Sequence, residues 1–327
     1  MAFFGKSPLF GLDIGSSAIK AVRLRKKQGT IHAERAGITA MPAGALSGGQ
    51  FLDPPAVANA IRKFCRRQRL GGRQVAVAVG GEDLFLTRLK LPRGADNDDV
   101  GARVLSEAIS MAPFPLHQAN LDFHTLNDSA DTGMIDALVV AVKRARVESL
   151  REVLHRAGKT PIVVDSTACC LANAFQFNYD PEPGEISALL HLGADMMTIC
   201  IVRGSTPLLS RDLPLAPPLY SDENWNLSER VAVQLERVFE MLDEIADEHP
   251  LEPGSSKISR IWLSGGGTRL RGLEEVLRDR IRLPFEEMNP FRNIQFDSAS
   301  EGGQAVLGYG HCMAVAVGLA LRNFDEL

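Results

Sequence analysis

The sequence predicts an α/β fold made of two lobes, and three observations lead to this prediction. Segments with the patterns of strands and helices alternate along the chain, which is typical of layered α/β proteins. A buried strand, a glycine turn and a second strand occur once around residue 13 and again around residue 191. The length of 327 residues is enough for about two domain-sized cores.

In the first part of the chain, alternating apolar residues indicate strands, whereas Val57, Ile61 and Phe64 recur at the spacing of a helix face. Gly158 ends a second helical pattern. In chain order we expect strands at 10–16, 19–24 and 30–39, a helix at 54–69, strands at 74–80 and 84–91, a helix at 97–111, a strand at 137–142, a helix at 147–157, a strand at 161–164 and a helix at 166–177.

The second part follows a similar order, with strands first and helices after them. The proline-rich segment 213–218 is the clearest loop. We expect strands at 187–192, 197–202 and 207–213, one long amphipathic helix at 226–248, a strand at 258–263, a helix at 272–281 and a final helix at 315–324.

Composition excludes several classes of protein. A hydrophobic share of 45% and a charged share of 23% are ordinary for a globular chain. The net charge of −4 argues against a general nucleic-acid binder, and the aromatic share of 6% argues against a base-stacking platform. Five cysteines without a CxxC motif or zinc spacing favour a reducing compartment over a disulfide scaffold or metal site.

We expect no targeting or membrane-spanning segment. The N-terminus lacks a basic region followed by a long apolar one, and the apolar run Cys312 to Leu321 has only 10 residues, where a bilayer needs about 20. A cytosolic protein is therefore expected, unless a partner holds it at a membrane. The basic cluster at 62–73 either faces an anionic inner leaflet or is a solvated helix face.

The repeated strand–glycine–strand pattern predicts two phosphate-binding hairpins. The first contains Asp13 and Gly15, with Lys20 five positions after the glycine, and the second contains Gly193, with Thr198 five positions after it. Glycine lets an anion approach the N–H groups of the turn, and the carboxylate at the strand end would hold Mg²⁺. A single hairpin of this kind is more often a structural turn, but the repetition and a third glycine turn at 264–268 favour phosphate binding.

These motifs and their order resemble the PilM family of type IV pilus proteins, within the actin-like ATPase superfamily that also includes Hsp70 and sugar kinases. The resemblance runs nearly end to end. GLDIGSSAIKAVRL resembles the first phosphate motif, MAPFPLHQANLDFHTL a helix end with the strand after it, VVDSTACCLANAF the connector between domains, LSGGGTRLRGL the adenosine motif and AVGLALRNFD the C-terminal ending.

The resemblance implies an actin-like (ribonuclease H-like) duplicated fold. It places the first lobe at 1–96 and 161–185, an inserted FtsA-type subdomain at 97–160, and the second lobe at 186–327, with a shortened adenine-covering subdomain around 216–257. It also implies ATP with Mg²⁺ as the cofactor, with Asp13 as the metal ligand. The implied nucleotide-binding residues are Asp13, Gly15, Ser16, Ser17, Lys20, Gly193, Thr198, Gly265, Gly266 and Gly267.

Four departures from the family pattern bear on chemistry. His191 stands where the second phosphate motif usually has Asp, and Thr167 stands where the connector usually has an acid. The segment 213–218 replaces a Gly-Gly pair, and the stretch between Leu215 and Ile258 holds only one evident helix. Loss of metal-supporting and water-positioning groups typically removes orders of magnitude in rate. We therefore expect weak ATP binding, doubtful turnover and no catalytic residues.

The resemblance implies a scaffold of a pilus inner-membrane platform, cytoplasmic and held at the membrane by partners. It would grip the cytosolic N-terminal tail of a PilN-like membrane protein beside the inserted subdomain, with Phe114 as a candidate contact, and would meet other platform proteins but no nucleic acid. Two alternatives are an active ATPase or sugar kinase and an FtsA-like division protein. The first lacks an identifiable catalytic Asp and substrate loop, and the second would end in an amphipathic membrane helix rather than in the apolar 315–324.

Overall fold

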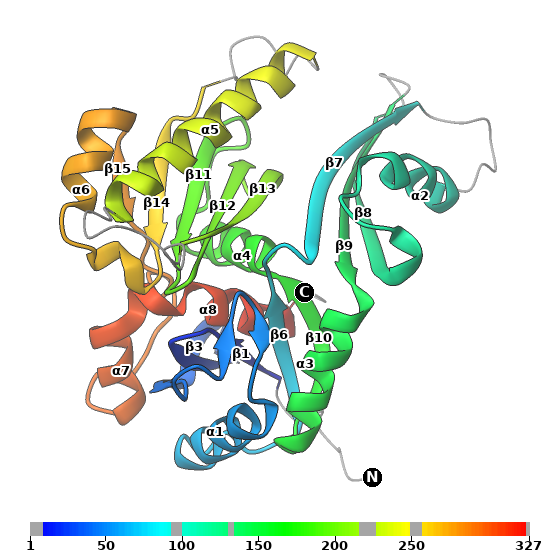
Figure 1. Ribbon diagram of the computed structural model, residues 1–327. Helices are drawn as coiled ribbons and strands as arrows, with labels where there is room; N and C mark the ends of the chain where they lie inside the picture. Colours follow the sequence, from blue (N-terminus) through cyan, green and yellow to red (C-terminus); the bar gives the residue numbers. More distant parts are fainter. Residues whose placement is uncertain (1–8, 93–99, 130–133, 216–226, 249–256, 325–327) are drawn as a thin grey trace.

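The computed structural model describes residues 9–92, 100–129, 134–215, 227–248 and 257–324. Two lobes face each other, and a smaller three-stranded sheet stands beside the first of them (Figure 1). The expected proline-rich loop lies mostly outside the described residues, as do parts of the shortened subdomain around 216–257.

The sheet of the first lobe has five strands in the order β10-β6-β1-β2-β3. β1 pairs antiparallel with β2 and parallel with β6, and β6 pairs parallel with β10. Parallel pairing aligns the carboxyl ends of β1, β6 and β10 at one edge. The strands are β1 (Phe10–Ile14), β2 (Ala18–Lys27), β3 (Thr30–Ala40), β6 (Gln74–Val79) and β10 (Thr160–Ser166), and a small hairpin joins β4 (Leu46–Ser47) to β5 (Gln50–Phe51).

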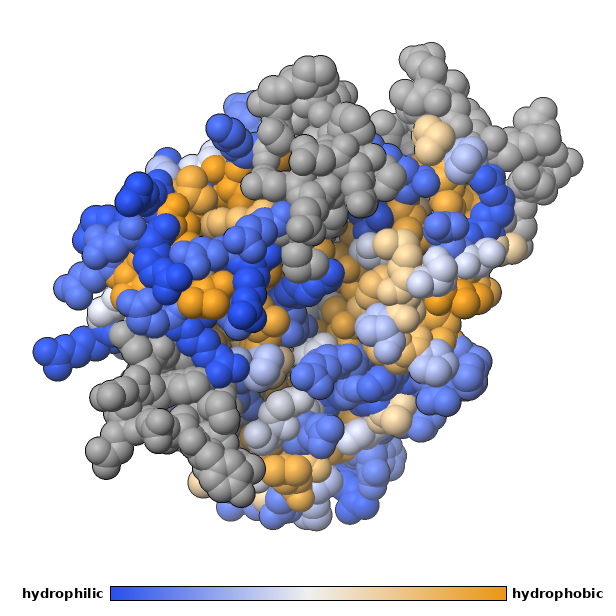
Figure 2. All heavy atoms as spheres, turned by 45° about the horizontal axis from the view of Figure 1, so that its top comes forward, coloured by the Kyte–Doolittle hydropathy of each residue, from blue (hydrophilic) through white to orange (hydrophobic). Residues whose placement is uncertain are grey.

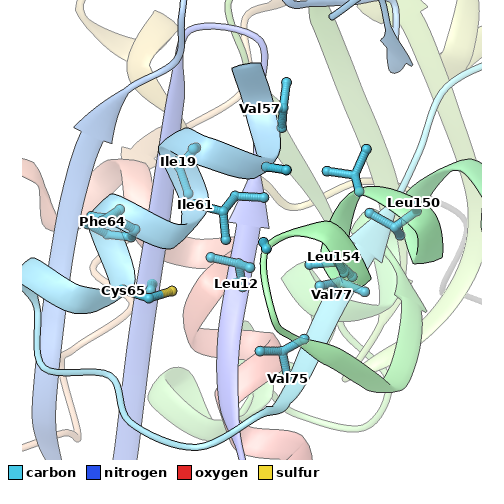
Figure 3. Packing of buried hydrophobic residues seen from close by; sticks show 14 of the residues in the cluster. Leu12, Ile19, Val57, Ile61, Phe64, Cys65, Val75, Val77, Leu150 and Leu154 are labelled. Carbon is cyan, nitrogen blue, oxygen red and sulfur yellow. The ribbon is translucent and has the colours of Figure 1, made fainter. Parts of the chain in front are cut away.

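Helices α1 (Pro54–Arg67) and α3 (Arg144–Arg156) cover one face of this sheet (Figure 1). α1 starts where the side chain of Asp53 accepts a hydrogen bond from the N–H of Ala56 at 2.9 Å, next to two prolines that suit a first helical turn. Its apolar stripe then meets the sheet and α3. Figure 3 shows this packing among Leu12, Ile19, Val57, Ile61, Phe64, Cys65, Val75, Val77, Leu150 and Leu154.

The second lobe repeats the strand arrangement of the first. β11 pairs antiparallel with β12 and parallel with β14, as β1 does with β2 and β6. Every residue of β11 is buried, which explains its continuous apolar sequence. The sheet order is β13-β12-β11-β14-β15, with β11 (Ile186–Leu192), β12 (Met196–Arg203), β13 (Thr206–Pro214), β14 (Arg260–Ser264) and β15 (Phe285–Glu287).

Helical segments of the second lobe bury one face of its sheet. The expected long helix is α5 (Leu227–Glu248). The helix expected at 272–281 is instead a short α6 (Leu273–Val276) that continues as a π-helical turn, Leu277–Ile281. Val231, Leu235, Leu273 and Leu277 pack with the apolar residues of β11 and β12.

The inserted sheet begins earlier than the expected boundary at residue 97. Its strand order is β7-β9-β8, with β7 (Leu84–Pro92), β8 (Ala119–Ser129) and β9 (Met134–Lys143), and α2 (Val100–Met111) packs on it. The expected end at residue 160 also differs, because Leu150, Val153 and Leu154 of α3 lie in the core of the first lobe. Strand pairing and helix burial thus delimit this subdomain at about 84–143.

The C-terminal segment returns to the first lobe, although the sequence assigned all of 186–327 to the second. The remaining helical elements are α4 (Thr167–Tyr179), α7 (Glu301–Tyr309), α8 (Ala314–Leu321) and the 3-10 turns Leu116–Gln118, Gly266–Arg269, Gly310–Met313 and Arg322–Phe324. α8 lies between α4 and β1, where an added Cβ at Gly318 would be 1.9 Å from the carbonyl oxygen of Cys170 and one at Gly11 would be 2.2 Å from that of Ala316. Glycine at both contacts lets the three elements approach closely.

One helical stretch of the described chain, Glu301–Phe324, is long and apolar enough to cross a membrane. Within its most apolar window, 67% is buried inside the molecule. Its α8 part packs with Val22, Leu24 and Ala174 in the hydrophobic core. The apolar character of this stretch is therefore that of a core helix.

A candidate nucleotide cleft between the lobes

A cleft of about 570 Å³ separates the two lobes, and both contribute to its walls. The first lobe supplies the turn after β1 and the glycines after β6, and the second supplies the turn after β11 and the 3-10 turn Gly266–Arg269. All ten residues expected to bind nucleotide line this cleft except Gly265. The carboxyl ends of parallel strands meet here, which is the usual position of a site in such sheets.

The two glycine hairpins have the same geometry. In the first, the N–H of Gly15 donates to the carbonyl of Ala18 at 3.0 Å, and in the second, the N–H of Gly193 donates to that of Met196 at 2.9 Å. The strand register pairs Asp13 with Lys20 in β1–β2 and His191 with Thr198 in β11–β12. His191 is therefore the counterpart of Asp13 in space as well as in sequence.

Asp13 already has a cationic partner. The ammonium of Lys20 lies 3.0 Å from a carboxylate oxygen of Asp13, and both side chains are only about an eighth exposed, at 12% and 13%. This short ion pair occupies the carboxylate that the sequence assigned to Mg²⁺. No group of three or more His, Cys, Asp or Glu side chains able to hold a metal is present among the described residues.

His191 brings no negative charge to the opposite hairpin. The side chain is buried, and its Nδ1 lies 3.0 Å from the hydroxyl of Ser264. Burial, assisted by the nearby Lys20, lowers the pKa of His191 to about 4. The imidazole is therefore neutral at pH 7 and supplies no anionic ligand for a hard cation such as Mg²⁺.

The third glycine turn has mixed roles. Gly265 has φ 91° and donates its N–H to the carbonyl of His311, and an added Cβ there would be 2.3 Å from the carbonyl oxygen of Leu192. Gly267 also packs on Leu192, with an added Cβ at 2.7 Å. Gly266 has open space toward Cys312 and, like Gly267, lines the cleft. Packing against the end of β11 therefore accounts for Gly265, and only its neighbours reach the cleft.

Two carboxylates that the sequence analysis did not single out connect the lobes. Asp195 accepts from the hydroxyl of Ser16 at 2.6 Å and from the N–H of Gly48 at 2.8 Å. Asp212 accepts from the N–H of Gly81 at 2.7 Å and from the hydroxyl of Thr198 at 2.5 Å. Donors of the first lobe that face the cleft are thereby bound to carboxylates of the second.

The surroundings of Asp212 explain why it was missed. Burial raises its pKa, and the hydrogen bonds from Thr198 and Gly81 oppose that rise. An added Cβ at Gly80 would be 3.0 Å from Asp212 and 2.9 Å from Thr167, so Asp212 stands beside the connector position that lacks an acid. Only the β12–β13 register brings it there. Asp195, by contrast, could have been found from the sequence, because it is the counterpart of Ser17 when the two hairpin sequences are aligned.

One further cation faces the cleft from the first lobe. Arg146, on the first turn of α3, lines the cleft, and its guanidinium lies 5.2 Å from the centre of the Phe51 ring. Its Nε has no hydrogen-bond partner within the described chain, and burial lowers its pKa despite the nearby Asp83. The cleft thus offers an arginine to an anion, whereas Lys20 is engaged by Asp13.

Comparisons with known proteins give the family. The family model described as type IV pilus assembly protein PilM matches residues 11–220 and 246–324. A solved PilM-PilN type IV pilus biogenesis complex is 25% identical, with a TM-score of 0.75 over 98% of this chain and 99% of the other.

More distant structures were also found. EutJ from Carboxydothermus hydrogenoformans is 11% identical over 96% of this chain and 90% of its own, with a TM-score of 0.48. MreB 5 of Spiroplasma citri bound to AMPPNP is 11% identical over 98% and 97%, also with a TM-score of 0.48. The match of the PilM model over most of the chain decides the assignment: the chain belongs to the PilM family of type IV pilus assembly proteins.

Proposed function

We propose that this protein is an actin-like scaffold of a type IV pilus assembly platform that binds the cytosolic tail of a PilN-like membrane protein. The observation that carries the proposal is the similarity to the PilM-PilN complex, which extends over 98% of this chain and includes the inserted subdomain. A protein held by such a tail is cytoplasmic and peripheral at the inner membrane. Contacts with other platform proteins belong to the same proposal.

The groove between the first lobe and the inserted subdomain is the proposed place for the tail. Figure 2 shows apolar residues at the surface of the inserted subdomain, on the right, with hydrophilic residues around them. Phe114 lies at one end of the inserted sheet, packed against Ala119 and Ala141, and the ammonium of Lys143 is 5.5 Å from its ring centre. An extended peptide needs such apolar pockets for alternate side chains.

Phe114→Leu is expected to weaken binding of a peptide with the sequence of the PilN tail, while the melting temperature changes little. Phe114 is only 9% exposed, so Phe114→Ala would leave a cavity and cost about 3 kcal/mol of stability, whereas leucine keeps most of the apolar volume. Peptide titration by fluorescence anisotropy and thermal melting measure the two effects. An unchanged affinity in a folded Phe114→Leu protein would remove Phe114 from the groove.

We propose in addition that the nucleotide cleft binds ATP weakly and does not turn it over. The supporting observations are the ion pair that occupies Asp13 and the neutral imidazole of His191. An active ATPase is the alternative, and one observation favours it: both phosphate hairpins face a cleft large enough for a nucleotide. If Mg²⁺-ATP binds, Asp13 is the carboxylate of the first hairpin that would hold the metal, in competition with Lys20.

Phosphate release from ATP is expected to equal the background rate measured with an Asp13→Ala variant. The reason is that the neutral His191 supplies no anionic ligand opposite Asp13, and the carboxylate of Asp195 on the second hairpin is engaged by Ser16 and Gly48. A coupled phosphate assay on protein from which contaminating ATPases are removed measures this rate. Hydrolysis that Asp13→Ala abolishes would establish the active-ATPase alternative. His191→Asp, which restores the acid, is expected to increase Mg²⁺-dependent ATP binding.

A further inference from the structure

We infer that the end of the first lobe away from the cleft binds the surface of a membrane that contains anionic phospholipids. This basic pole consists of six exposed side chains on the second half of α1 and the loop after it: Arg62, Lys63, Arg66, Arg67, Arg69 and Arg73. The segment 54–81 contains no Asp or Glu, although the net charge of the whole chain is −4. The inference does not rest on the proposed partner or on the state of the cleft.

The sheet topology separates the basic pole from the cleft. The carboxyl ends of the parallel strands β1, β6 and β10 lead into the cleft, and their amino ends lie at the opposite edge. At that edge the N–H of Thr160 donates to the carbonyl of Arg73 at 2.7 Å. In Figure 1, α1 and the lower end of α3 form the bottom of the molecule, below the sheet. A membrane at this pole leaves the cleft accessible.

The pole contains a cavity of about 390 Å³ between the ends of α1 and α3. Its charged lining residues are all cationic: Arg62, Arg66, Arg69 and Lys159. The ammonium of Lys159 donates to the carbonyls of Leu70 and Gly72 at 3.1 and 2.8 Å, which fixes a positive charge at the back of the cavity. The phosphate of a lipid headgroup matches a cavity of this size and charge.

These cations are not explained by a role in stabilising the C-terminus of α1. Cations at a helix C-terminus stabilise it, but the carbonyls of Phe64, Cys65 and Arg66 already accept from the backbone N–H groups of residues 68, 70 and 69. Arg67 lies 3.8 Å from Glu301, and Arg62 donates to the carbonyl of Arg156. The guanidinium groups of Arg66 and Arg69 have no acceptor in the described part of the chain, so both are available to an external anion.

Neighbouring apolar side chains favour a lipid surface over a nucleic acid. Ile162 and Val164 are 55% and 37% exposed on β10, which starts at the pole and forms an edge of the sheet. Basic side chains together with exposed apolar ones are typical of proteins that bind anionic membrane surfaces. The sole aromatic residue of 62–73, Phe64, is buried, so this pole has no ring on which a base would stack.

The test is co-sedimentation of the full chain, without partner peptide, with vesicles of phosphatidylcholine alone or mixed with phosphatidylglycerol. Binding to the mixed vesicles is expected, and it should weaken as salt screens the charges. Each basic residue contributes about a fivefold change in partitioning. The double variant Arg66→Gln/Arg69→Gln should therefore bind about 25-fold more weakly. The single variant Arg66→Gln should bind about fivefold more weakly, and Arg237→Gln, at an exposed arginine on α5 of the other lobe, is its matched control and should bind like the original chain.

Several outcomes would overturn the inference. One is the absence of binding to the phosphatidylglycerol vesicles. Another is equal binding by the double variant and by the Arg237→Gln control. A third is saturable binding of inorganic phosphate or duplex DNA that depends on Arg66 and Arg69 without any binding to vesicles. Thermal melting of each variant verifies that the compared proteins are folded.

Discussion

Asp195→Asn is expected to tighten the binding of pyrophosphate and ATP about tenfold. The carboxylate of Asp195 now accepts hydrogen bonds from Ser16 and Gly48 inside the cleft. A phosphate placed against the first hairpin would compete for these donors and would be repelled by the charge. At about 5 Å and an effective dielectric constant of about 20, that repulsion is about 3 kcal/mol, and solvent screens part of it. Isothermal titration calorimetry measures the change.

Two further variants separate charge from structure in this experiment. Asp195→Ala removes the hydrogen bonds as well as the charge and is expected to lower the free energy of unfolding by about 1 to 3 kcal/mol. The amide oxygen of asparagine can still accept from the N–H of Gly48, and its NH2 group can donate to the hydroxyl of Ser16. Asp180→Asn removes a carboxylate from an exposed left-handed position outside the cleft and serves as the control. Equal affinities of the Asp195→Asn and Asp180→Asn proteins for pyrophosphate would contradict the prediction.

Stability is expected to fall by about 3 kcal/mol between pH 6.5 and about pH 4 because of His191. Burial lowers the pKa of His191 to about 4 in the folded protein, whereas an unfolded histidine titrates near its ordinary value. In this window the unfolded chain binds the extra proton, so acidification favours unfolding. The contribution is complete above the unfolded pKa and is lost as the pH falls through the window. Urea unfolding at a series of pH values measures it.

The comparison protein for this pH series is His191→Gln. Glutamine still offers a partner to the hydroxyl of Ser264, which lies 3.0 Å from the imidazole, but it does not titrate. Carboxylates titrate in both proteins, so the difference between the two profiles isolates the histidine. Parallel profiles between pH 6.5 and pH 4 would show that folding does not lower the pKa of His191, and would contradict the prediction. The imidazole chemical shifts of the original chain give the same pKa independently.

Local pattern was sufficient for most of the fold. The alternation of strands and helices, together with the repeated glycine hairpin, predicted an α/β fold with two lobes, and the family resemblance implied that it is actin-like; the family match and the paired hairpins confirm the prediction. The helix α7 was missed because its sequence, EGGQAVLGY, contains three glycines. Two of those glycines, Gly302 and Gly303, serve close contacts: an added Cβ would be 3.2 Å from the N–H nitrogen of Ala36 at the first and 1.9 Å from the carbonyl oxygen of Asp297 at the second. Helix propensity describes a residue's preference in an isolated helix, so it cannot indicate that close packing favours glycine in this one.

The sequence by itself determined the two hairpins and the residue at position 191, because each depends on residues close together in the chain, and it determined the family, because the motifs follow one another in a recognisable order. Tertiary structure alone decided which groups meet across the cleft. Ser16 and Asp195 are 179 positions apart, and Gly81 and Asp212 are 131 apart, yet both pairs are hydrogen-bonded. It also decided that α8 belongs to the first lobe, since glycine at positions 11 and 318 lets that helix lie between β1 and α4. Contacts between distant segments depend on how whole helices and strands pack against one another. The pattern of residues along the chain does not tell which distant residues come together.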